Sequence, residues 1–422
     1  MSGKTELLIF DDHPPQVVVE SAIFLDIYPS TALDNTTKII AFQINGSKTE
    51  YLDLNDTLLS LKVKVVKGDG TNIKTADAVK PIPSNFFMNA LFSDVSLSLN
   101  NIQIEGGDSL YAYKATIESA LNFSFDSKRY QLLPAGYCDE DDEREKWVGE
   151  SAEFELVGAL RLDFFRHPKY LIPGVDVSLR LTKSSDSFAL NIAAGKVLGT
   201  NTFEVIFTQA KLYVRRVKVS PSVELGHNTG LVKKNAIYPY TRTKTIRYVI
   251  PTGSSSFLKE NIFGSAQLPK FMVVGMVSGE AFNGSYTKEP FDFAHFDVAK
   301  VALYRDGQMI PYKNAYNTNF GKKHFADAYV RSILHNTQLL NTNNNNGIDM
   351  SDFAENGYCF FTFNLTPDFD MNQPQVVKDS NLRLGIQFIN ALKESINVVV
   401  YGIFDGKIEI TKDKRIIKDA RT

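Results

Sequence analysis

The chain has 422 residues, with 46 basic and 48 acidic side chains and a formal net charge of −2. This balance argues against a protein that coats nucleic acid, because such a protein needs an excess of cations to neutralise phosphates. Hydrophobic residues make up 43% of the sequence and charged residues 22%, which excludes a disordered chain. The length suits two β-rich domains of about 200 residues each.

The sequence has no run of about 18 apolar residues and no apolar signal-peptide core, so we expect neither a membrane span nor secretion. The chain contains two cysteines, Cys138 and Cys359. A secreted protein built from two sandwiches usually carries more cysteines, so the sequence predicts a reducing compartment.

The first 33 residues form an arm ahead of the regular strand pattern, and residues 13–19 and 21–27 of this arm are apolar. An apolar segment outside a core covers either its own domain or a neighbouring subunit. The sequence leaves both alternatives open.

Alternation of apolar and polar residues dominates the rest of the chain and predicts half-buried strands. The predicted strands lie at residues 59–65, 95–99, 160–164, 177–181, 301–303, 382–384 and 407–410. Turn signals rich in Gly, Asn and Asp punctuate them at residues 68–70, 100–101, 306–307 and 405–406.

Two segments show the spacing of a helix. In the first, Asp108 and Ser109 can cap a run that places Leu110, Tyr113, Ile117 and Leu121 on one face. The second spans residues 322–334, with apolar residues four positions apart. Because helices do not alternate regularly with the strands, the pattern predicts an all-β protein and excludes a doubly wound parallel sheet.

The two halves of the chain resemble each other. Six short segments recur in the same order at offsets between 196 and 213: residues 38–42 and 244–248, 95–104 and 301–310, 117 and 330, 159–162 and 362–365, 178–181 and 381–384, and 211–214 and 407–410. Such a repeat indicates two copies of one structural unit.

We therefore predict an N-terminal arm at 1–33, a first jelly roll at 34–219 and a second jelly roll with a C-terminal tail at 220–422. Long loops are expected at 133–151 and 337–357, and the latter contains an Asn run at 343–346. The junction is expected as a turn-rich linker near residues 219–230.

No catalytic motif is visible. The six histidines are His13, His167, His227, His295, His324 and His335. They form neither a His-X-His pair nor a His-Glu-X-X-His segment, and a metal enzyme on a jelly roll would need such a motif. Cys138 lies beside acidic residues, which disfavour a reactive thiolate, and Cys359 has the setting of a core residue. Glu118 and Glu155 have no partner that the sequence identifies. We predict no catalytic, cofactor-binding or metal site.

Two charged clusters stand out. The acidic run at 139–146 is interpreted as a solvated loop, with a cation site as the alternative. The C-terminal basic cluster comprises Lys407, Lys412, Lys414, Arg415, Lys418 and Arg421, and nearby acidic residues dilute it. It is interpreted as a solvated strand and tail, with contact to an internal protein, nucleic acid or membrane as the alternative.

Residues 84–101 and 111–122 resemble major capsid proteins of the adenovirus-hexon-like lineage, most of all those of Maverick/Polinton elements and adintoviruses. The shared features are a Leu-Phe-Ser strand with an Asn turn and then a Tyr-rich helix. Residues 51–58 and the Pro-Pro-Gln-Val segment at 14–17 fit the same pattern.

The resemblance implies two tandem eight-stranded jelly rolls, a short helix in each, and no catalysis. It further implies a homotrimer of nearly hexagonal outline that tiles an icosahedral viral shell. Partners would be further trimers, minor or penton capsid proteins, and an internal membrane or cement protein at the base. The protein would reside in the virion and assemble in the host cytoplasm or nucleus.

Three other classes compete with this interpretation. A two-domain adhesin or carbohydrate-binding protein is the main alternative, but it would be expected to carry a signal peptide and more disulfides. A jelly-roll enzyme would need a constellation of catalytic residues. A minor capsid protein usually has one jelly roll.

Overall fold

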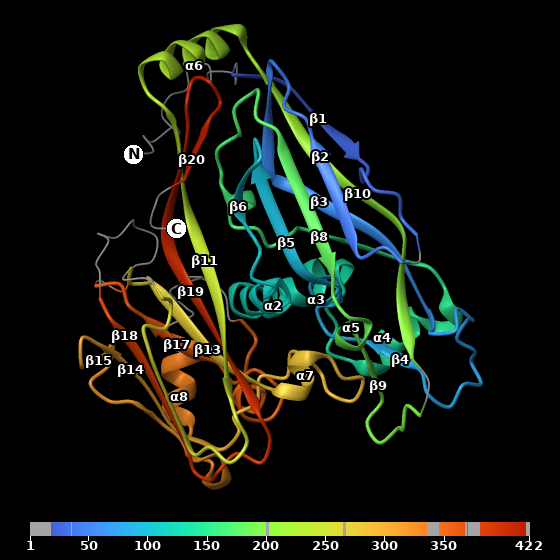
Figure 1. Ribbon diagram of the computed structural model, residues 1–422, viewed down its shortest axis with the longest axis vertical. Helices are drawn as coiled ribbons and strands as arrows, with labels where there is room; N and C mark the ends of the chain where they lie inside the picture. The colour runs from blue at the N-terminus through green and yellow to red at the C-terminus, as the bar shows by residue number, and fades with distance from the viewer. Residues whose placement is uncertain are drawn as a thin grey trace, which may run out of the picture.

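The computed structural model describes residues 18–34, 36–199, 202–264, 267–335, 346–367, 369 and 380–418. The strands of this part form two groups of sheets, one from each half of the sequence, which stand side by side in Figure 1. Helices α2 and α3 lie between the two groups (Figure 1). No helix of the described residues is both long and apolar enough to cross a membrane.

The first half forms a sandwich of two antiparallel sheets. One sheet has the order β1 (Val19–Ile27), β10 (Phe203–Val219), β3 (Glu50–Lys67) and β7 (Phe154–Gly158). The other has the order β2 (Ile39–Ile44), β8 (Val177–Lys183), β5 (Phe92–Leu99) and β6 (Ile102–Glu105). A small extra sheet pairs β4 (Pro81–Pro83) with β9 (Leu190–Ile192).

The second half repeats this arrangement. One sheet has the order β11 (Ala236–Ile250), β19 (Ile396–Ile410), β13 (Phe271–Ser278) and β17 (Phe361–Asn364), with β20 (Ile416–Lys418) beside β19. The other has the order β12 (Ser256–Glu260), β18 (Leu382–Phe388), β14 (Val298–Arg305) and β15 (Gln308–Ile310), with β16 (Tyr316–Asn317) beside β14.

In each half the first, third, sixth and last of eight main strands make one sheet, in the same spatial order. This strand order is that of two jelly-roll sandwiches. The predicted all-β fold with a repeated jelly roll is confirmed. The exact boundaries proposed at residues 33 and 219 stay a prediction.

Alternation along the strands produces the core. In β3, Leu59, Leu61 and Val63 point inwards and are fully buried, while Lys62 and Lys64 alternate with them. Rings from opposing sheets meet in the interior, as where Phe92 of β5 stacks on Phe207 of β10 with ring centroids 5.9 Å apart.

Two of the predicted turns form tight hairpins. Asn100 and Asn101 adopt φ of 45° and 66° between β5 and β6, and Asp306 and Gly307 adopt φ of 49° and 83° between β14 and β15. Asn, Asp and Gly tolerate this left-handed region. The turn predicted at 405–406 is wrong, because both residues continue β19 and pair with β11.

The helices of the described residues are α1 (Phe87–Ala90), α2 (Tyr111–Asn122), α3 (Phe125–Gln131), α4 (Asp141–Trp147), α5 (Asp186–Ala189), α6 (Pro221–Lys233), α7 (Gly279–Asn283), α8 (Ala326–Tyr329) and α10 (Met350–Ala354). A π-helical turn (Val330–His335) extends α8, and short 3₁₀ turns occur at Leu133–Ala135, Gly149–Ser151, Phe164–Arg166 and Phe320–Lys322.

Both predicted helices exist, but the expectation of only two was wrong. The acidic run predicted as a loop forms α4, whose first turn is acidic and thus matches the helix dipole. The junction predicted as a turn-rich linker forms α6. The predicted cap of the first helix is also wrong: α2 begins after Leu110, and the Asp108 carboxylate accepts the N–H of Leu110 instead.

Two details of the strand prediction are wrong as well. Residues 160–162 are not a strand, although Leu160 and Leu162 are buried, because the carbonyl of Arg161 accepts a side-chain hydrogen bond from Lys114 instead of a strand partner. The match of residues 159–162 with residues 362–365 therefore fails, because only the latter segment overlaps a strand, β17.

The repeat alignment is correct for three of the matched segments. The hairpin β5–β6 matches β14–β15, β8 matches β18, and β10 matches β19 by their places in the sheets. The match of residues 38–42 with 244–248 is wrong, because β2 lies in the sheet equivalent to that of β12, whereas β11 is equivalent to β1. Alternation alone does not identify the sheet to which a strand belongs.

Part of the predicted arm belongs to the first sandwich. Strand β1 pairs antiparallel with β10, from Val19 opposite Val219 to Ile27 opposite Leu212. The predictions for residues 13–17, Asn343–345 and Arg421 lie outside the described residues.

Gly402 of β19 provides a test of the packing in the second sandwich. A Cβ at this position would overlap the buried ring of Phe263, so we expect Gly402→Ala to lower the free energy of unfolding by about 1–3 kcal/mol. Urea unfolding followed by circular dichroism measures this change.

The matched control is Gly226→Ala in α6, where a Cβ meets nothing within 4 Å. We expect this control to be neutral or to stabilise by up to about 1 kcal/mol through helix propensity. Equal effects of the two substitutions would contradict the packing described for β19.

Candidate functional site

The histidines of the described residues do not form a metal site. The Nδ1 atom of His167 accepts the N–H of Lys169 at 2.9 Å, and that of His295 accepts the N–H of Asp297 at 2.8 Å. Burial lowers the pKa of both imidazoles, which favours their neutral form. No group of three or more His, Cys, Asp or Glu side chains in the described part of the chain is placed to hold a metal ion.

The remaining histidines are equally separate. His227 of α6 lies 2.7 Å from the hydroxyl of Tyr51 through its Nδ1 atom. His324 is exposed, and its backbone pairs with that of Asn319. His13 and the side chain of His335 lie outside the described residues.

The two cysteines are free thiols. Cys138 is half-buried, with its Sγ atom 3.7 Å from the carbonyl oxygen of Glu140. Burial raises the pKa of the Cys359 thiol, which keeps it protonated. Cys359 therefore has the setting of a core residue, as predicted.

The C-terminal basic residues are spread over strands and turns. Lys407 of β19 lies 2.7 Å from Glu409, and the carbonyl of Lys414 accepts a hydrogen bond from Asn100 at 2.7 Å. Burial lowers the pKa of Lys414 and Lys418. The last described segment thus folds back as β20 onto β19 and touches the first sandwich.

The two carboxylates without a predicted partner have different environments. Glu155 of β7 accepts a hydrogen bond from Ser60 at 3.0 Å. Glu118 of α2 is buried between the two sandwiches, where it accepts a hydrogen bond from Tyr401 of β19 at 2.9 Å and pairs with Arg166.

Glu118 belongs to a larger buried group, which we call the interface cluster: Glu105, Lys114, Glu118, Asp163 and Arg166 of the first sandwich, with Thr243 and Tyr401 of the second. Lys114 of α2 pairs with Glu105 and lies 2.9 Å from Asp163. Asp163 in turn accepts the backbone N–H of Thr243 in β11 at 2.6 Å. The cluster therefore joins the two sandwiches through ions and hydrogen bonds.

The charges of the interface cluster influence one another. Burial opposes the ammonium of Lys114, but Asp163 and Glu105 outweigh it and raise the pKa of Lys114. Burial and then the charge of Asp163 raise the pKa of Glu105 to about 7 despite the nearby Lys114. Glu105 and Asp163 thus share the one ammonium of Lys114, and repulsion from Asp163 opposes the ionisation of Glu105.

Aromatic contacts reinforce this boundary. Tyr113 of α2 stacks on Phe282 of α7 with ring centroids 5.0 Å apart, and it makes T-shaped contacts with Phe291 and Phe293. Every residue of α2 from Tyr111 to Leu121 is buried. A helix buried on all sides is expected where two domains share a core.

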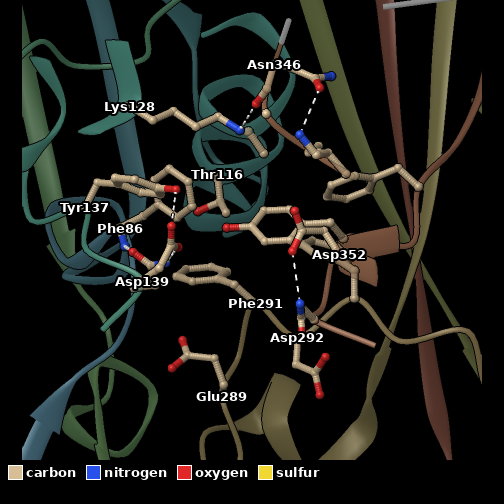
Figure 2. Close-up of a pocket in the computed structure, with 18 of the residues that line it drawn as sticks. Phe86, Thr116, Lys128, Tyr137, Asp139, Glu289, Phe291, Asp292, Asn346 and Asp352 are labelled. Atoms are coloured by element: carbon tan, nitrogen blue, oxygen red, sulfur yellow. Dashed lines mark hydrogen bonds between the residues drawn. The ribbon is translucent and has the colours of Figure 1, made fainter. Parts of the chain in front are cut away.

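A cavity of about 570 Å³ opens beside this boundary and is lined by residues from both halves of the chain (Figure 2). Thr116 and Lys128 approach it from α2 and α3, whereas Glu289, Asp292 and Asp352 approach it from the second half. No sequence motif marks this cavity, because its lining residues come from distant parts of the chain.

The sequence offered a partial signal for the interface cluster. Lys114 and Glu118 are four residues apart on the predicted helix, and a charged pair next to an apolar face is a candidate for a buried ion pair. The partners Glu105, Asp163 and Tyr401 are distant in sequence, and their meeting depends on how the two sandwiches dock.

The fold is that of double jelly-roll capsid proteins. The chain is similar over 100% of its length to 93% of a chain of the Sputnik virophage, with a TM-score of 0.65 and 10% identity. It is similar over 98% of its length to the whole of a chain in the PBCV-1 virus capsid, with a TM-score of 0.61 and 11% identity. The mavirus major capsid protein gives a TM-score of 0.56 at 12% identity, with 98% of this chain and 93% of that chain covered.

An uncharacterized protein of Caenorhabditis elegans is 26% identical to this chain over 386 residues, which cover 86% of this chain and 89% of that protein. No family model matches the chain.

Removal of the ammonium from the interface cluster tests its role in stability. Lys114→Met leaves Glu105 and Asp163 buried without their cation, so we expect the free energy of unfolding to fall by roughly 3–5 kcal/mol. The control Lys146→Met removes an ammonium whose side chain is 67% exposed on α4, and we expect a change below about 0.5 kcal/mol. Chemical unfolding of both variants measures the difference, and a similar small effect for both would contradict the role of the cluster.

The raised pKa of Glu105 makes stability depend on pH. The pKa of this carboxyl is about 7 in the folded chain, against about 4.3 when unfolded. The folded protein therefore becomes less stable as the pH rises through this window. The amide of Glu105→Gln stays neutral, so we expect this variant to show a smaller fall of the unfolding free energy between about pH 5 and pH 7.5. One titrating group contributes a slope of at most about 1.4 kcal/mol per pH unit.

Unfolding curves at several pH values measure this slope for the wild type and for Glu105→Gln. The control Glu204→Gln changes an exposed carboxylate of β10 and is expected to leave the slope as it is. If Glu105→Gln retained the full slope of the wild type, another group would have to carry it.

Proposed function

We propose that this chain is a major capsid protein, a structural subunit of a viral shell that acts without catalysis. The observation that carries this proposal is the presence of two jelly rolls of identical strand order in one chain, with a likeness to a Sputnik virophage chain over the full length. The likeness to the mavirus major capsid protein gives further support.

In the proposed assembly, three chains form a homotrimer. Each chain contributes two similar sandwiches, so a trimer presents six of them in a nearly hexagonal ring that can tile an icosahedral facet. The interface cluster supports this arrangement, because a tiling unit needs its two sandwiches held in one fixed relation.

Apolar side chains at the sheet edge are candidates for trimer contacts. Ile23 and Phe24 of the edge strand β1, and Tyr28 directly after it, are 50–58% exposed. An obligate interface of about 2,000–5,000 Å² would bury such side chains.

The ends of the sandwiches suggest an orientation in the shell. Helix α6 lies at one end of the molecule, and helices α4, α5 and α7 lie in the half away from it (Figure 1). We assign the end with α4, which belongs to the segment 133–151, to the outer surface, together with the segment 337–357 as far as it is described. The end with α6 would face the interior, where an internal membrane or a cement protein could contact it.

Further parts of the proposal follow from the sequence resemblance. The chain would belong with capsid proteins of Maverick/Polinton elements and adintoviruses, interact with minor or penton capsid proteins, and reside in the virion after assembly in the host cytoplasm or nucleus. The C-terminal basic residues, such as Lys412 and Arg415, would be available to an internal component.

Size measurement of the purified chain tests the proposal. We expect light scattering to give three times the 47.2 kDa of one chain, and negative-stain images to show nearly hexagonal particles. We expect Phe24→Asp to shift the protein towards monomer while its thermal unfolding stays cooperative, whereas Glu204→Gln on an exposed part of β10 leaves the trimer intact.

A stable monomer at every concentration would overturn the capsid proposal. The alternative, an adhesin or carbohydrate-binding protein with two sandwiches, predicts such a monomer and binding to a glycan array.

A further inference from the structure

The cavity of about 570 Å³ between the two halves of the chain has an acidic wall. Its lining includes five carboxylates, Asp139, Glu289, Asp292, Asp352 and Glu355, against two cations, Lys128 and Arg144. Both cations already have protein partners. Lys128 donates to the carbonyl of Asn346 at 2.7 Å. Arg144 donates to the carbonyl of Pro83, pairs with Asp141 and lies 3.6 Å from Oε2 of Glu289.

The five carboxylates differ in what they bind. Asp139 accepts hydrogen bonds from Asn85 and Tyr137, and Asp352 accepts hydrogen bonds from Asp349 and Asn356. Within the described residues, neither an ion pair nor a hydrogen bond reaches the carboxylates of Asp292 and Glu355. Burial raises the pKa of Asp292, as expected for a carboxylate that no cation compensates.

Two enclosed oxygen atoms of the lining also lack a partner in the described structure. Thr116 of α2 is 2% exposed, and its Oγ1 atom makes no hydrogen bond. Glu289 accepts a hydrogen bond from Asn191 through Oε2, but its Oε1 atom is enclosed and unpaired. Buried polar atoms without a partner are rare and costly, and a ligand that donates hydrogen bonds would satisfy both oxygen atoms.

Aromatic rings make up much of the remaining lining, and Phe86, Phe125 and Phe291 are among them. An aromatic face attracts an organic cation and also packs against its aliphatic part. A bare metal ion does not suit this cavity, because no group of three or more ligating side chains converges anywhere in the described residues. The volume lies in the range of sites for small organic molecules.

We propose that this cavity binds an extended organic cation with ammonium or guanidinium groups at its ends and an aliphatic stem between them. The charged groups donate to Asp292, to Oε1 of Glu289 and to the hydroxyl of Thr116, while the stem lies against the phenyl rings. Such a ligand is a free polyamine or the basic side chains of a peptide. The site is built within one chain, so it does not depend on assembly into a shell.

Titration calorimetry on the full chain at low salt tests the proposal, with spermidine as one probe and an acetylated Gly-Arg-Gly-Arg-Gly amide as the other. We expect at least one probe to bind with one site per chain. Asp292→Asn is expected to weaken that binding about tenfold, because it removes a charge-assisted hydrogen bond. Thr116→Val, which keeps the shape of the side chain, is expected to weaken it several-fold.

The matched control is Glu204→Gln, which removes one negative charge from an exposed position of β10 outside the cavity lining. Thermal unfolding of each variant establishes that it is folded. Binding of spermidine alone identifies a free polyamine as the ligand class, and binding of the peptide alone identifies a basic protein segment; either result supports the site if Asp292→Asn weakens it selectively. Absence of binding by both probes, or an equal loss in Asp292→Asn and Glu204→Gln, would overturn the proposal.

Discussion

The burial of charge between the two sandwiches is the constraint on which the arrangement of the molecule depends. Lys114 is surrounded by Glu105 and Asp163, and Asp163 and Glu118 reach across to Thr243 and Tyr401. Buried ions require well-placed partners, because each ion has lost its hydration. Any sliding of one sandwich against the other would separate these groups, so the cluster selects a single docking geometry.

The helix α2 makes this constraint possible. It presents Lys114 and Glu118 to the ion network and Tyr113 to the rings of the second half. Apolar contact alone would tolerate several relative positions of two smooth sheets, whereas ions and hydrogen bonds do not. The helix thus combines the energy of aromatic burial with the geometric demand of the charged groups.

Local patterns in the sequence predicted most of the strands, two of the hairpins, the helix α2 and the helical segment of α8 with its π-helical turn, but not the helix α6. They failed where a distant partner decides the outcome. Alternation assigned residues 38–42 and 244–248 to the same repeat position, yet sheet membership depends on β8 and β19, which follow much later in the chain. Likewise, Asp405 and Gly406 have the composition of a turn, but pairing with β11 extends the strand through them.

The charged boundary was beyond prediction for a similar reason. Composition suggested a solvated loop at the acidic run, but Arg144 within it is buried and binds the carbonyl of Pro83. The partners of Glu118 come from residues 166 and 401, and no local spacing connects them. Cores with alternating apolar residues tolerate wide sequence change, which explains how a fold can be shared at 10% identity.

The pairing of β1 with β10 has a consequence for how the chain is made. Ile27 lies opposite Leu212 in the strand pairing, so the first sheet acquires its edge strand only after almost the whole first half has been synthesised. The pairing of β11 with β19 imposes the same delay on the second half. Contacts between such distant positions form slowly. The nascent chain therefore carries exposed strands for much of its synthesis, and binding by chaperones during translation would limit their aggregation.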